Sequence, residues 1–464
     1  MESASSREAE VHWAKIEAVA WEWVRIQIVS ISNLPKEGLF NHDKPDAYIC
    51  VTANGEQPDI DFDSNVNEFK FPVHSNETNP KWYRTGVVAY TKDTASSIKF
   101  TVKDKNDVFS DKLILEQEVP VPPESDSWEE ATMTQGDVKL TVRLQRSSTP
   151  ICSRADYDAM QLQAKTLKID GDGGDHAVLM SRTNPKHSKC VLYYPGRGDV
   201  FANPLVFEAF WKRGYDFYSL DPRRCGRSRR YMEDPAVGHT LANFDEYEPE
   251  LDLTMKIIAD TKKYDTTLAY CHSTGLLVCM NYHLLQFKKD VKSPFDGIIL
   301  DAPFLDWGSG AVGGNFMEFV LENGTGIASK LLGEDFVLMK GNGISTWWFK
   351  MWIQYRWDLR ADNYMMSTHM TAEFCNAVSR LQEKLLNHEE GPLLPDIPSI
   401  CMSSKGDDTL TNEETLSLVH KILPKAILRE FDHHNHNVVM SNSKQMSEEA
   451  IDTFTAWMDK EFPS

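Results

Sequence analysis

The hydrophobic pattern of the chain changes near residue 160, and the pattern beyond that point strongly limits the folds that the chain can adopt. Short apolar runs such as CVLYYPG, YDFYSLD, TTLAYCHS, FDGIILDAP and PSICMSS alternate with helical stretches in which apolar residues recur every three or four positions. Strand and helix in alternation predict a mostly parallel sheet with helices on both faces. Ligands of such sheets bind beyond the carboxyl ends of the strands, so the residues after these runs are the first candidates for a functional site.

The first part of the chain has a different pattern. Residues 24–146 contain short alternating runs such as VRIQIVSI, DAYICVTA and SIKFTV, separated by Pro, Asn, Asp and Gly, which predict an all-β sandwich. We expect a helical arm at 1–23, a polar linker at 147–160 and an α/β domain at 161–464. A segment at about 305–395 separates two predicted strands and is too long for an ordinary connection, so we expect it to be an inserted helical cap.

Composition excludes some classes of function. The net charge is −20, and a chain this acidic lacks the clustered Lys and Arg that neutralise phosphates, so we expect no nucleic-acid partner. The eight cysteines include no CxxC pair, and the N-terminus lacks the apolar core of a signal peptide. No apolar run approaches the roughly eighteen residues that cross a bilayer. These features predict reduced thiols and a cytoplasmic protein.

One of the apolar runs ends in a serine. Ser273 stands in the sequence Cys271, His272, Ser273, Thr274, Gly275, which matches G-x-S-x-G except at its first glycine. A cysteine at the first position is small enough to fit with some strain. A hydroxyl is a weak nucleophile at neutral pH and needs a nearby base that is itself held by a carboxylate. The local match is weak evidence by itself, so partners elsewhere in the chain must decide the role of Ser273.

Candidate partners follow two later apolar runs. Asp407 and Asp408 come after the run PSICMSS, and His433, His434 and His436 come after the run AILREF. Polar residues at the end of a strand are common. A serine, an acid and a histidine in this order, each after a predicted strand, nevertheless favour a catalytic triad.

A triad that transfers acyl groups also needs an oxyanion hole. One donor is the backbone N–H that follows the serine, at Thr274. The loop in LYYPGRGDVF is the candidate for the second donor, because Gly196 allows close approach of the backbone and the N–H of Arg197 follows it. We therefore predict that Gly196 also lies in the substrate-binding site.

Several motifs together carry a resemblance to a known family. GYDFYSLDPRRCGRS, CHSTG, LDAPFLD and HNVVMS make residues 160–464 resemble the α/β-hydrolase superfamily, and within it the serine aminopeptidase S33 or monoacylglycerol-lipase-like branch. The resemblance implies that Ser273 is the nucleophile, His436 the base and Asp407 the acid, with Asp408 as the alternative acid. The chain departs from the family pattern at Pro195, Cys271 and Leu276.

A second resemblance covers the first part of the chain. ETNPKW and FTVKDKNDVFSDKLIL make residues 24–144 resemble a C2 domain. In many C2 domains oxygen ligands on two loops bind calcium. The resemblance places Asp46, Asp104, Asn106 and Asp111 at ligand positions, whereas an early first-loop aspartate is missing, with Asp43 as a possible substitute.

Membrane contact by this domain needs more than charge. The first 150 residues carry more Asp and Glu than Lys and Arg, so attraction to anionic lipid alone is not expected. Bound calcium would bridge to lipid, or the apolar pairs Leu39-Phe40 and Val108-Phe109 would insert. The alternative is that these pairs pack against the second half of the chain.

These observations lead to one main hypothesis and two alternatives. The main hypothesis is a serine hydrolase that cleaves a lipid-like carboxylic ester, such as a monoacylglycerol or a lysophospholipid, without a cofactor for catalysis. By themselves the aromatic residues of the expected cap are more typical of a core of the cap itself, and the sharper hypothesis is that Trp347 and Trp348 line the substrate pocket. The alternatives are a serine aminopeptidase and a catalytically degraded scaffold protein tethered by its C2 domain.

Overall fold

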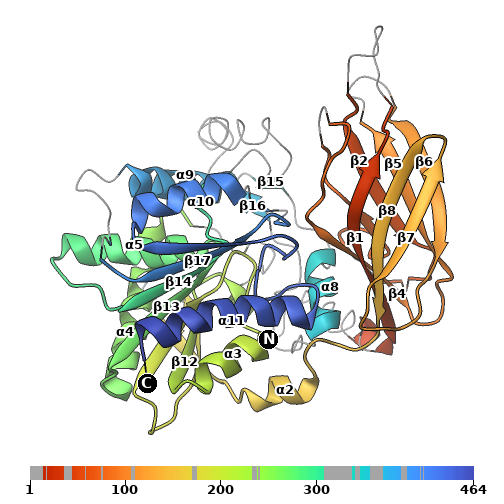
Figure 1. Ribbon diagram of the computed structural model, residues 1–464. Coiled ribbons are helices and arrows are strands. Elements are labelled where there is room, and N and C mark those ends of the chain that lie inside the picture. Colours follow the sequence, from red (N-terminus) through yellow and green to blue (C-terminus); the bar gives the residue numbers. More distant parts are fainter. Residues whose placement is uncertain are drawn as a thin grey trace.

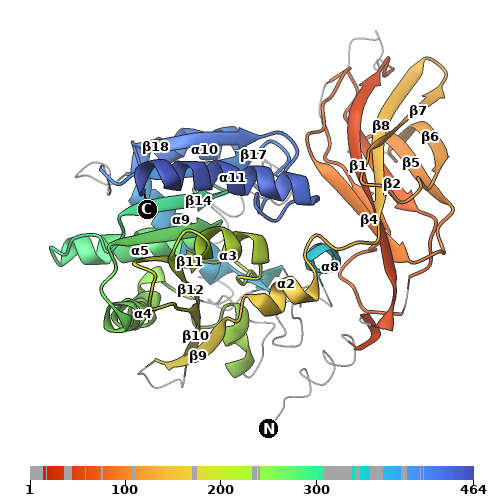
Figure 2. The same cartoon turned by 60° about the horizontal axis from the view of Figure 1, so that its bottom comes forward.

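The computed structural model consists of a β-sandwich and an α/β domain that lie side by side, with helix α8 (Thr346–Tyr355) between them (Figures 1 and 2). The residues that the structure describes are 14–16, 18–35, 44–57, 59–74, 77–105, 110–169, 175–232, 238, 241–307, 337–339, 345–355, 369–387, 394, 396–407, 409–410 and 412–463. None of the helices in these ranges is both long enough and apolar enough to cross a membrane.

The sandwich is built from two antiparallel sheets, which confirms the predicted all-β domain. One sheet has the order β4 (Thr85–Thr91), β1 (Trp21–Ser32), β8 (Val138–Ser147) and β7 (Glu129–Gln135). The other has the order β3 (Glu68–Lys70), β2 (Ala47–Ala53), β5 (Ser97–Asp104) and β6 (Lys112–Pro120). Their inner faces enclose a core that includes Val24, Phe71, Phe100 and Leu140.

Strand β1 begins at Trp21, earlier than the predicted start at residue 24. Its first six residues are all buried, because the face that does not line the sandwich core packs against the α/β domain. A strand buried on both faces does not alternate between apolar and polar residues, so its start could not be read from alternation. The stretch expected as a linker also contains a short helix, α2 (Arg154–Ala159), which begins with a capping box at Ser153.

The α/β domain contains the predicted, mostly parallel sheet. Its order is β18 (Ala426–Phe431), β17 (Ser399–Ser404), β14 (Gly297–Asp301), β13 (Thr266–His272), β11 (Lys189–Tyr194), β12 (Tyr215–Asp221), β10 (His176–Arg182) and β9 (Gln163–Lys168). The strands from β18 to β12 are parallel, and β10 pairs antiparallel with both of its neighbours. Buried runs of apolar residues form the central strands, as a sheet covered on both faces requires.

Helices cover both faces of this sheet (Figures 1 and 2). Helices α3 (Pro204–Trp211) and α11 (Lys444–Glu461) pack on one face through residues such as Phe210 and Phe454. The other face is covered by α4 (Glu248–Thr261), α5 (Gly275–Lys288), α9 (Ala372–Leu386) and α10 (Asn412–Ile422). Short 3-10 helices occur at Gly226–Tyr231 and Phe244–Tyr247.

The described parts of the expected cap are α8, α9 and a two-stranded ribbon of β15 (Val337–Met339) and β16 (Met370–Thr371). Helix α8 packs against the sandwich, where the ring of Phe349 lies 4.7 Å from that of Trp21 and 4.8 Å from that of Phe62. The backbone N–H of Thr346 also donates to Asp63 at 2.8 Å. This part of the insertion therefore joins the two domains.

Candidate active site

Ser273 occupies a tight turn between β13 and α5 at the carboxyl edge of the sheet. Its φ is +50°, a left-handed conformation that costs a non-glycine residue about 1–3 kcal/mol. Two backbone hydrogen bonds hold the turn: Ser273 N–H donates to the Asp301 carbonyl at 3.0 Å, and Phe304 N–H donates to the Ser273 carbonyl at 3.2 Å. The structure therefore presents the serine on a strained strand-to-helix turn, as the G-x-S-x-G pattern predicts.

Gly275 and Cys271 occupy the two glycine positions of that pattern. A Cβ on Gly275 would lie 2.2 Å from the Tyr194 carbonyl oxygen, so only glycine lets the start of α5 approach the end of β11 this closely. Cys271 is fully buried and, unlike Ser273, does not have a positive φ, so the backbone strain lies at the serine instead. Burial raises the pKa of Cys271 well above its ordinary value, which keeps the thiol protonated.

The structure brings His436 and Asp407 together. His436 Nδ1 lies 2.8 Å from Asp407 Oδ2, and both side chains are buried. The other carboxylate oxygen of Asp407 accepts the backbone N–H groups of Thr409 at 2.7 Å and Leu410 at 3.0 Å. Asp408, the alternative acid, lies outside the described residues. Of the two candidates, Asp407 is thus the one seen bonded to the histidine.

Asp301 connects the serine turn to the histidine loop. Its carbonyl accepts the Ser273 N–H, and its carboxylate accepts the Val438 N–H at 2.9 Å and the Tyr270 hydroxyl at 3.0 Å. Burial raises the pKa of the Asp301 carboxyl. Electrostatic attraction to nearby His272, together with these two hydrogen bonds, lowers the pKa and so partly opposes the effect of burial. Sequence reasoning missed this residue, although an aspartate at the carboxyl end of a buried strand was a usable signal.

A second histidine–aspartate pair lies beside the candidate triad. His272 Nδ1 is 2.8 Å from Asp199 Oδ2, and both residues are almost completely buried. The ring centres of His272 and His436 are 5.2 Å apart. Since Asp199 belongs to the loop after β11, the pair ties that loop to the residue before Ser273. Both residues lie in motifs that the sequence singles out, but no local pattern indicated that they would meet.

The predicted oxyanion loop lies directly over the serine turn. A Cβ on Gly196 would be 3.0 Å from both Ser273 Cβ and His272 Nδ1, so the loop passes close to the serine and a larger residue would have to push these side chains aside. No described residue accepts the backbone N–H of Arg197 or Thr274, which leaves both available for a substrate oxygen. The N-terminus of α5 adds a favourable field for negative charge at this point.

The side chain of Arg197 extends from this loop to the cap. Its Nη2 donates to the His369 carbonyl at 2.7 Å, and its guanidinium lies 5.4 Å from the centre of the Phe374 ring. His369 immediately precedes β16 and Phe374 is in the first turn of α9. The loop that carries the predicted oxyanion donor is thereby attached to the described part of the insertion.

The predicted substrate-binding tryptophans are only partly accounted for. Trp347 and Trp348 belong to α8, but their side chains lie outside the described residues. The described side chains of the same helix, including Phe349 and Trp352, pack in a cluster with Trp21 and Trp23 of the sandwich. This helix therefore has a structural role at the domain boundary.

The calcium ligands implied by the C2 resemblance do not form a complete cage among the described residues. Asp104 Oδ1 accepts the Asp46 N–H at 2.7 Å, and Asp111 accepts the Tyr48 hydroxyl. Burial and Asp111 raise the pKa of Tyr48. Asn106 lies outside the described residues, as do residue 43 and the apolar pairs 39–40 and 108–109. Within the described ranges, no three His, Cys, Asp or Glu residues gather to hold a metal, so calcium binding stays a prediction.

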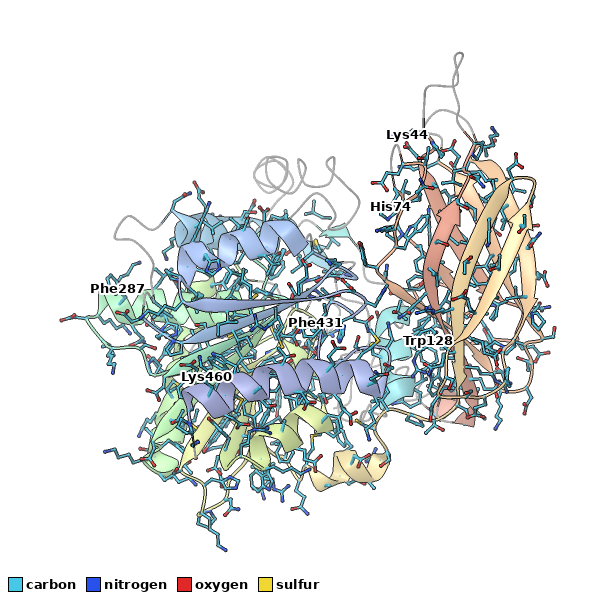
Figure 3. All side chains as sticks on the ribbon, viewed as in Figure 1. Lys44, His74, Trp128, Phe287, Phe431 and Lys460 are labelled. Atoms are coloured by element: carbon cyan, nitrogen blue, oxygen red, sulfur yellow. The ribbon has the colours of Figure 1, made fainter. Side chains whose placement is uncertain are left out.

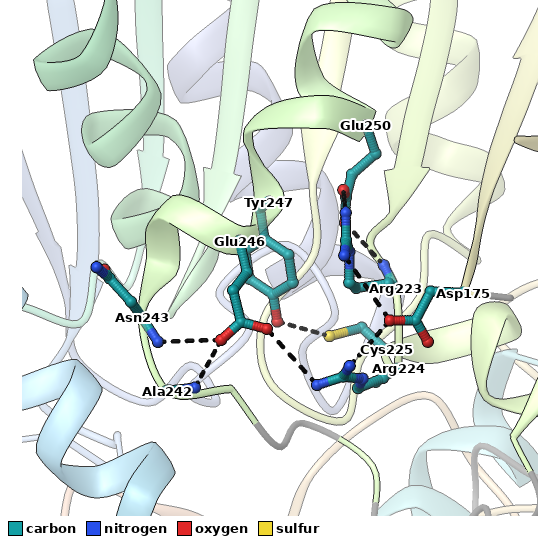
Figure 4. Close-up of polar contacts among 9 residues, drawn as sticks. All are labelled: Asp175, Arg223, Arg224, Cys225, Ala242, Asn243, Glu246, Tyr247 and Glu250. Carbon is teal, nitrogen blue, oxygen red and sulfur yellow. Dashed lines mark hydrogen bonds and ion pairs between the residues drawn. The ribbon is translucent and has the colours of Figure 1, made fainter. Parts of the chain in front are cut away.

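The arginine-rich turn after β12 is occupied by ion pairs (Figure 4). Arg223 forms a two-pronged contact with the buried Glu250, at 3.0 Å and 2.6 Å. Arg224 pairs with Asp175 at 2.9 Å and with Glu246 at 3.6 Å. These side chains hold the turn against α4 and against the residue that leads into β10, which is a structural role.

Comparison with known proteins identifies the family. The profile described as serine aminopeptidase, S33, matches residues 186–440, more than half of the chain. The chain belongs to the serine aminopeptidase S33 family. A C2-domain profile matches residues 23–135 of this S33 family member, so both predicted resemblances are confirmed, and with them the α/β-hydrolase fold. No curated protein matches the chain.

Several solved structures are similar to this S33 family member at low sequence identity. A monoglyceride lipase from Saccharomyces cerevisiae is 14% identical, with 65% of this chain and 97% of that chain covered and a TM-score of 0.46. A carboxyl esterase from Bacillus coagulans is 12% identical, with coverage of 64% and 98% and a TM-score of 0.48. A C2 domain of a plant extended synaptotagmin 1 is 16% identical, with coverage of 27% and 93% and a TM-score of 0.22.

Proposed function

We propose that the protein is a serine hydrolase that cleaves carboxylic esters, with Ser273 as nucleophile, His436 as general base and Asp407 as the acid that orients it. The observation that carries this proposal is the 2.8 Å contact between His436 Nδ1 and Asp407 Oδ2. Both residues lie on loops at the edge of the sheet where Ser273 follows strand β13. With the Nδ1 proton donated to the carboxylate, His436 Nε2 keeps a lone pair that can accept a proton from a hydroxyl.

The reaction proceeds through an acyl-enzyme. Ser273 Oγ attacks the ester carbonyl carbon while His436 Nε2 takes its proton, and the N–H groups of Thr274 and Arg197 bind the oxyanion. The imidazolium then gives that proton to the leaving alcohol as the carbon–oxygen bond breaks. Water attacks the acyl-enzyme with His436 again as base, and the acid leaves as the proton returns to Ser273. Asp407 stays ionised throughout and stabilises the imidazolium.

Within the part of the chain that the structure describes, the carboxylates beside the serine favour an ester over a peptide with a free amino terminus. An aminopeptidase needs a carboxylate for the substrate ammonium group. Two buried carboxylates beside the serine, Asp199 and Asp301, already accept hydrogen bonds from His272 and from Tyr270. Together with the adjoining C2 domain, this supports a lipid-like ester such as a monoacylglycerol or a lysophospholipid, met at the periphery of a membrane.

The chain departs from the family pattern at Pro195, Cys271 and Leu276. These departures would support a catalytically degraded scaffold protein only if they disturbed the candidate active site. Cys271 and Leu276 are completely buried, and Pro195 is buried as well, so these side chains act in packing and not at the reacting atoms. The hydrogen-bonded pair of His436 and Asp407 keeps the arrangement that a general base needs. These points favour the enzyme.

A fluorophosphonate probe tests the proposal directly, because it labels only an activated serine. We expect mass spectrometry to find the label at Ser273 in the wild type and to find none in Ser273→Ala. Asp407→Asn should label and turn over about 10⁴-fold more slowly, and His436→Ala about 10⁶-fold more slowly, as in other triads.

Substrate preference then separates the two hydrolase hypotheses. Activity on p-nitrophenyl and glycerol esters of graded chain length supports the proposal, whereas activity confined to aminoacyl p-nitroanilides supports the aminopeptidase. A folded wild type whose Ser273 does not react would exclude both and leave the scaffold.

A further inference from the structure

The C2 domain touches the hydrolase domain at the loops that form the candidate site. A cluster of buried side chains combines the outer face of β1 and β4 with residues from the loop after β11, from the histidine loop and from α8. Its members include Trp21, Trp23, Val87, Ala89, Val200, Ala202, Phe349 and Met440. The sheet face that a free C2 domain would expose to solvent is thus part of the domain boundary.

Hydrogen bonds to the C2 domain flank the candidate base in the sequence. Thr85 Oγ1 donates to the His433 carbonyl at 3.2 Å, and His433 Nδ1 contacts the Tyr83 carbonyl. On the other side of His436, the Asn442 side chain donates to the Thr85 carbonyl at 3.1 Å, and Arg25 Nε donates to the Asn442 carbonyl. The segment from 433 to 442 is therefore held by the C2 domain at both ends.

The loop of the candidate acid meets the same place on the C2 domain. A Cβ on Gly406, the residue before Asp407, would lie 3.0 Å from the Tyr83 carbonyl oxygen and 2.7 Å from the His434 carbonyl oxygen. The ammonium group of Lys405 lies 5.2 Å from the centre of the Tyr83 ring. The segment that leads into β4 thus contacts the loops of both the acid and the base.

The contact is polar here and borders a groove. Trp128 from the sandwich and Phe431 at the end of β18 line that groove, together with Gln27 and His433 (Figure 3). Gln27 also donates to Thr85 Oγ1 at 3.1 Å, so this hydroxyl lies between the two domains.

We propose that the C2 domain positions the catalytic base, with Thr85 and Arg25 as positioning residues that act through His433 and Asn442. This inference rests on the proposed function, because it assigns these contacts a role in the geometry of His436 relative to Asp407 and Ser273. The hydrolase domain bonds this loop itself, through Ser404 to the His434 carbonyl at 2.7 Å and through the Val438 N–H to Asp301 at 2.9 Å. The C2 domain adds contacts at His433 and Asn442, one on each side of His436.

Thr85→Val in the full-length chain tests the inference, since valine keeps the shape and removes the hydroxyl. A small displacement of a catalytic group is costly, and we expect kcat and the rate of fluorophosphonate labelling to fall by about tenfold. KM should stay within about twofold, because the substrate pocket is untouched. Thr85→Ser, which restores the hydroxyl, should recover the wild-type rates.

Thr132→Val is the matched control. Thr132 is exposed on β7, at the opposite edge of the same sheet, and its hydroxyl bonds only to Thr141 at 3.2 Å among the described residues. This variant should react like the wild type. If Thr85→Val does not fold, Arg25→Lys replaces it with the same expectation, since lysine keeps the charge and loses the Nε donor.

The outcomes separate this inference from the proposed function. A reactive wild type with unchanged rates in folded Thr85→Val would overturn the positioning role and leave the hydrolase intact. An equal loss in Thr132→Val would overturn it too, because the effect would then follow from loss of a hydroxyl elsewhere on the sheet and not from the contact between the domains. A wild-type Ser273 that does not react would overturn the proposed function, and this inference with it.

Discussion

The close packing at Gly275 predicts a large effect from a single methyl group. In Gly275→Ala the new Cβ would lie 2.2 Å from the Tyr194 carbonyl oxygen, 2.8 Å from its carbonyl carbon and 2.9 Å from the Pro195 carbonyl oxygen. Real Cβ atoms essentially never approach other heavy atoms within 3.0 Å, and all three neighbours are backbone atoms that cannot rotate away. The start of α5 must therefore move away from the end of β11 by about 1 Å.

This displacement separates the two predicted oxyanion donors. Thr274 precedes the substituted residue, and Arg197 belongs to the loop that follows Tyr194 and Pro195. Misplacement of about 1 Å at a catalytic group costs about 10²-fold in rate, and loss of one oxyanion donor costs a similar factor. Overpacking also destabilises the fold by about 1–3 kcal/mol.

The assay measures kcat on an ester substrate and the rate of fluorophosphonate labelling, with a urea titration of each variant. Gly214→Ala is the control, because Gly214 has a φ of +76° but no heavy atom within 4 Å of its Cβ position. Gly214→Ala introduces backbone strain without a steric clash, so we expect its kcat and its rate of fluorophosphonate labelling to match those of the wild type. Folded Gly275→Ala with kcat within about twofold of the wild type would refute the reasoning.

Three further predictions concern pH, the domain boundary and calcium. Burial lowers the pKa of His434 to about 4, against 6.5 when unfolded, so protonation favours unfolding and stability is lost as the pH falls from 6.5 towards 4. At pH 5 this residue should make the free energy of unfolding about 2 kcal/mol smaller than at pH 7, and His434→Gln should remove that difference in urea titrations. Phe349→Ala should destabilise the chain by about 3–5 kcal/mol through the loss of a buried ring, and an unchanged melting temperature would contradict this. The calcium prediction requires that excess Ca²⁺ raises the melting temperature of the full chain and that Asp104→Asn removes this rise, and a melting temperature unchanged by calcium would contradict it.

Local patterns predicted the parts of the structure that depend on neighbouring residues. The buried strands lie where the alternation of strand and helix indicated, and Ser273, Asp407 and His436 each follow a strand that was predicted. Contacts between distant segments could not be predicted in this way. His272 and Asp199 are 73 residues apart and meet only because β11 and β13 are neighbours in the sheet.

The same limit explains the unexpected packing of α8. Its Trp, Phe and Met residues are typical of a helix with a broad apolar surface, but periodicity does not say which surface will cover it. A cap core and a pocket wall were the two expectations for this segment, and the described side chains instead pack against Trp21 and Phe62. The early start of β1 has the same cause, since it depends on what covers its second face.

The contacts around Thr85 have a consequence for how such chains diverge and how they can be recombined. A C2 domain borrowed from another protein would bring a different residue to the place where Thr85 meets His433 and Asn442. Each of these bonds joins a side chain of one domain to a backbone carbonyl of the other, so homologues with this domain order need only retain a hydroxyl at position 85 and an amide at position 442. A chimera whose new C2 domain lacks that hydroxyl should turn over at the parental rate only after it is restored.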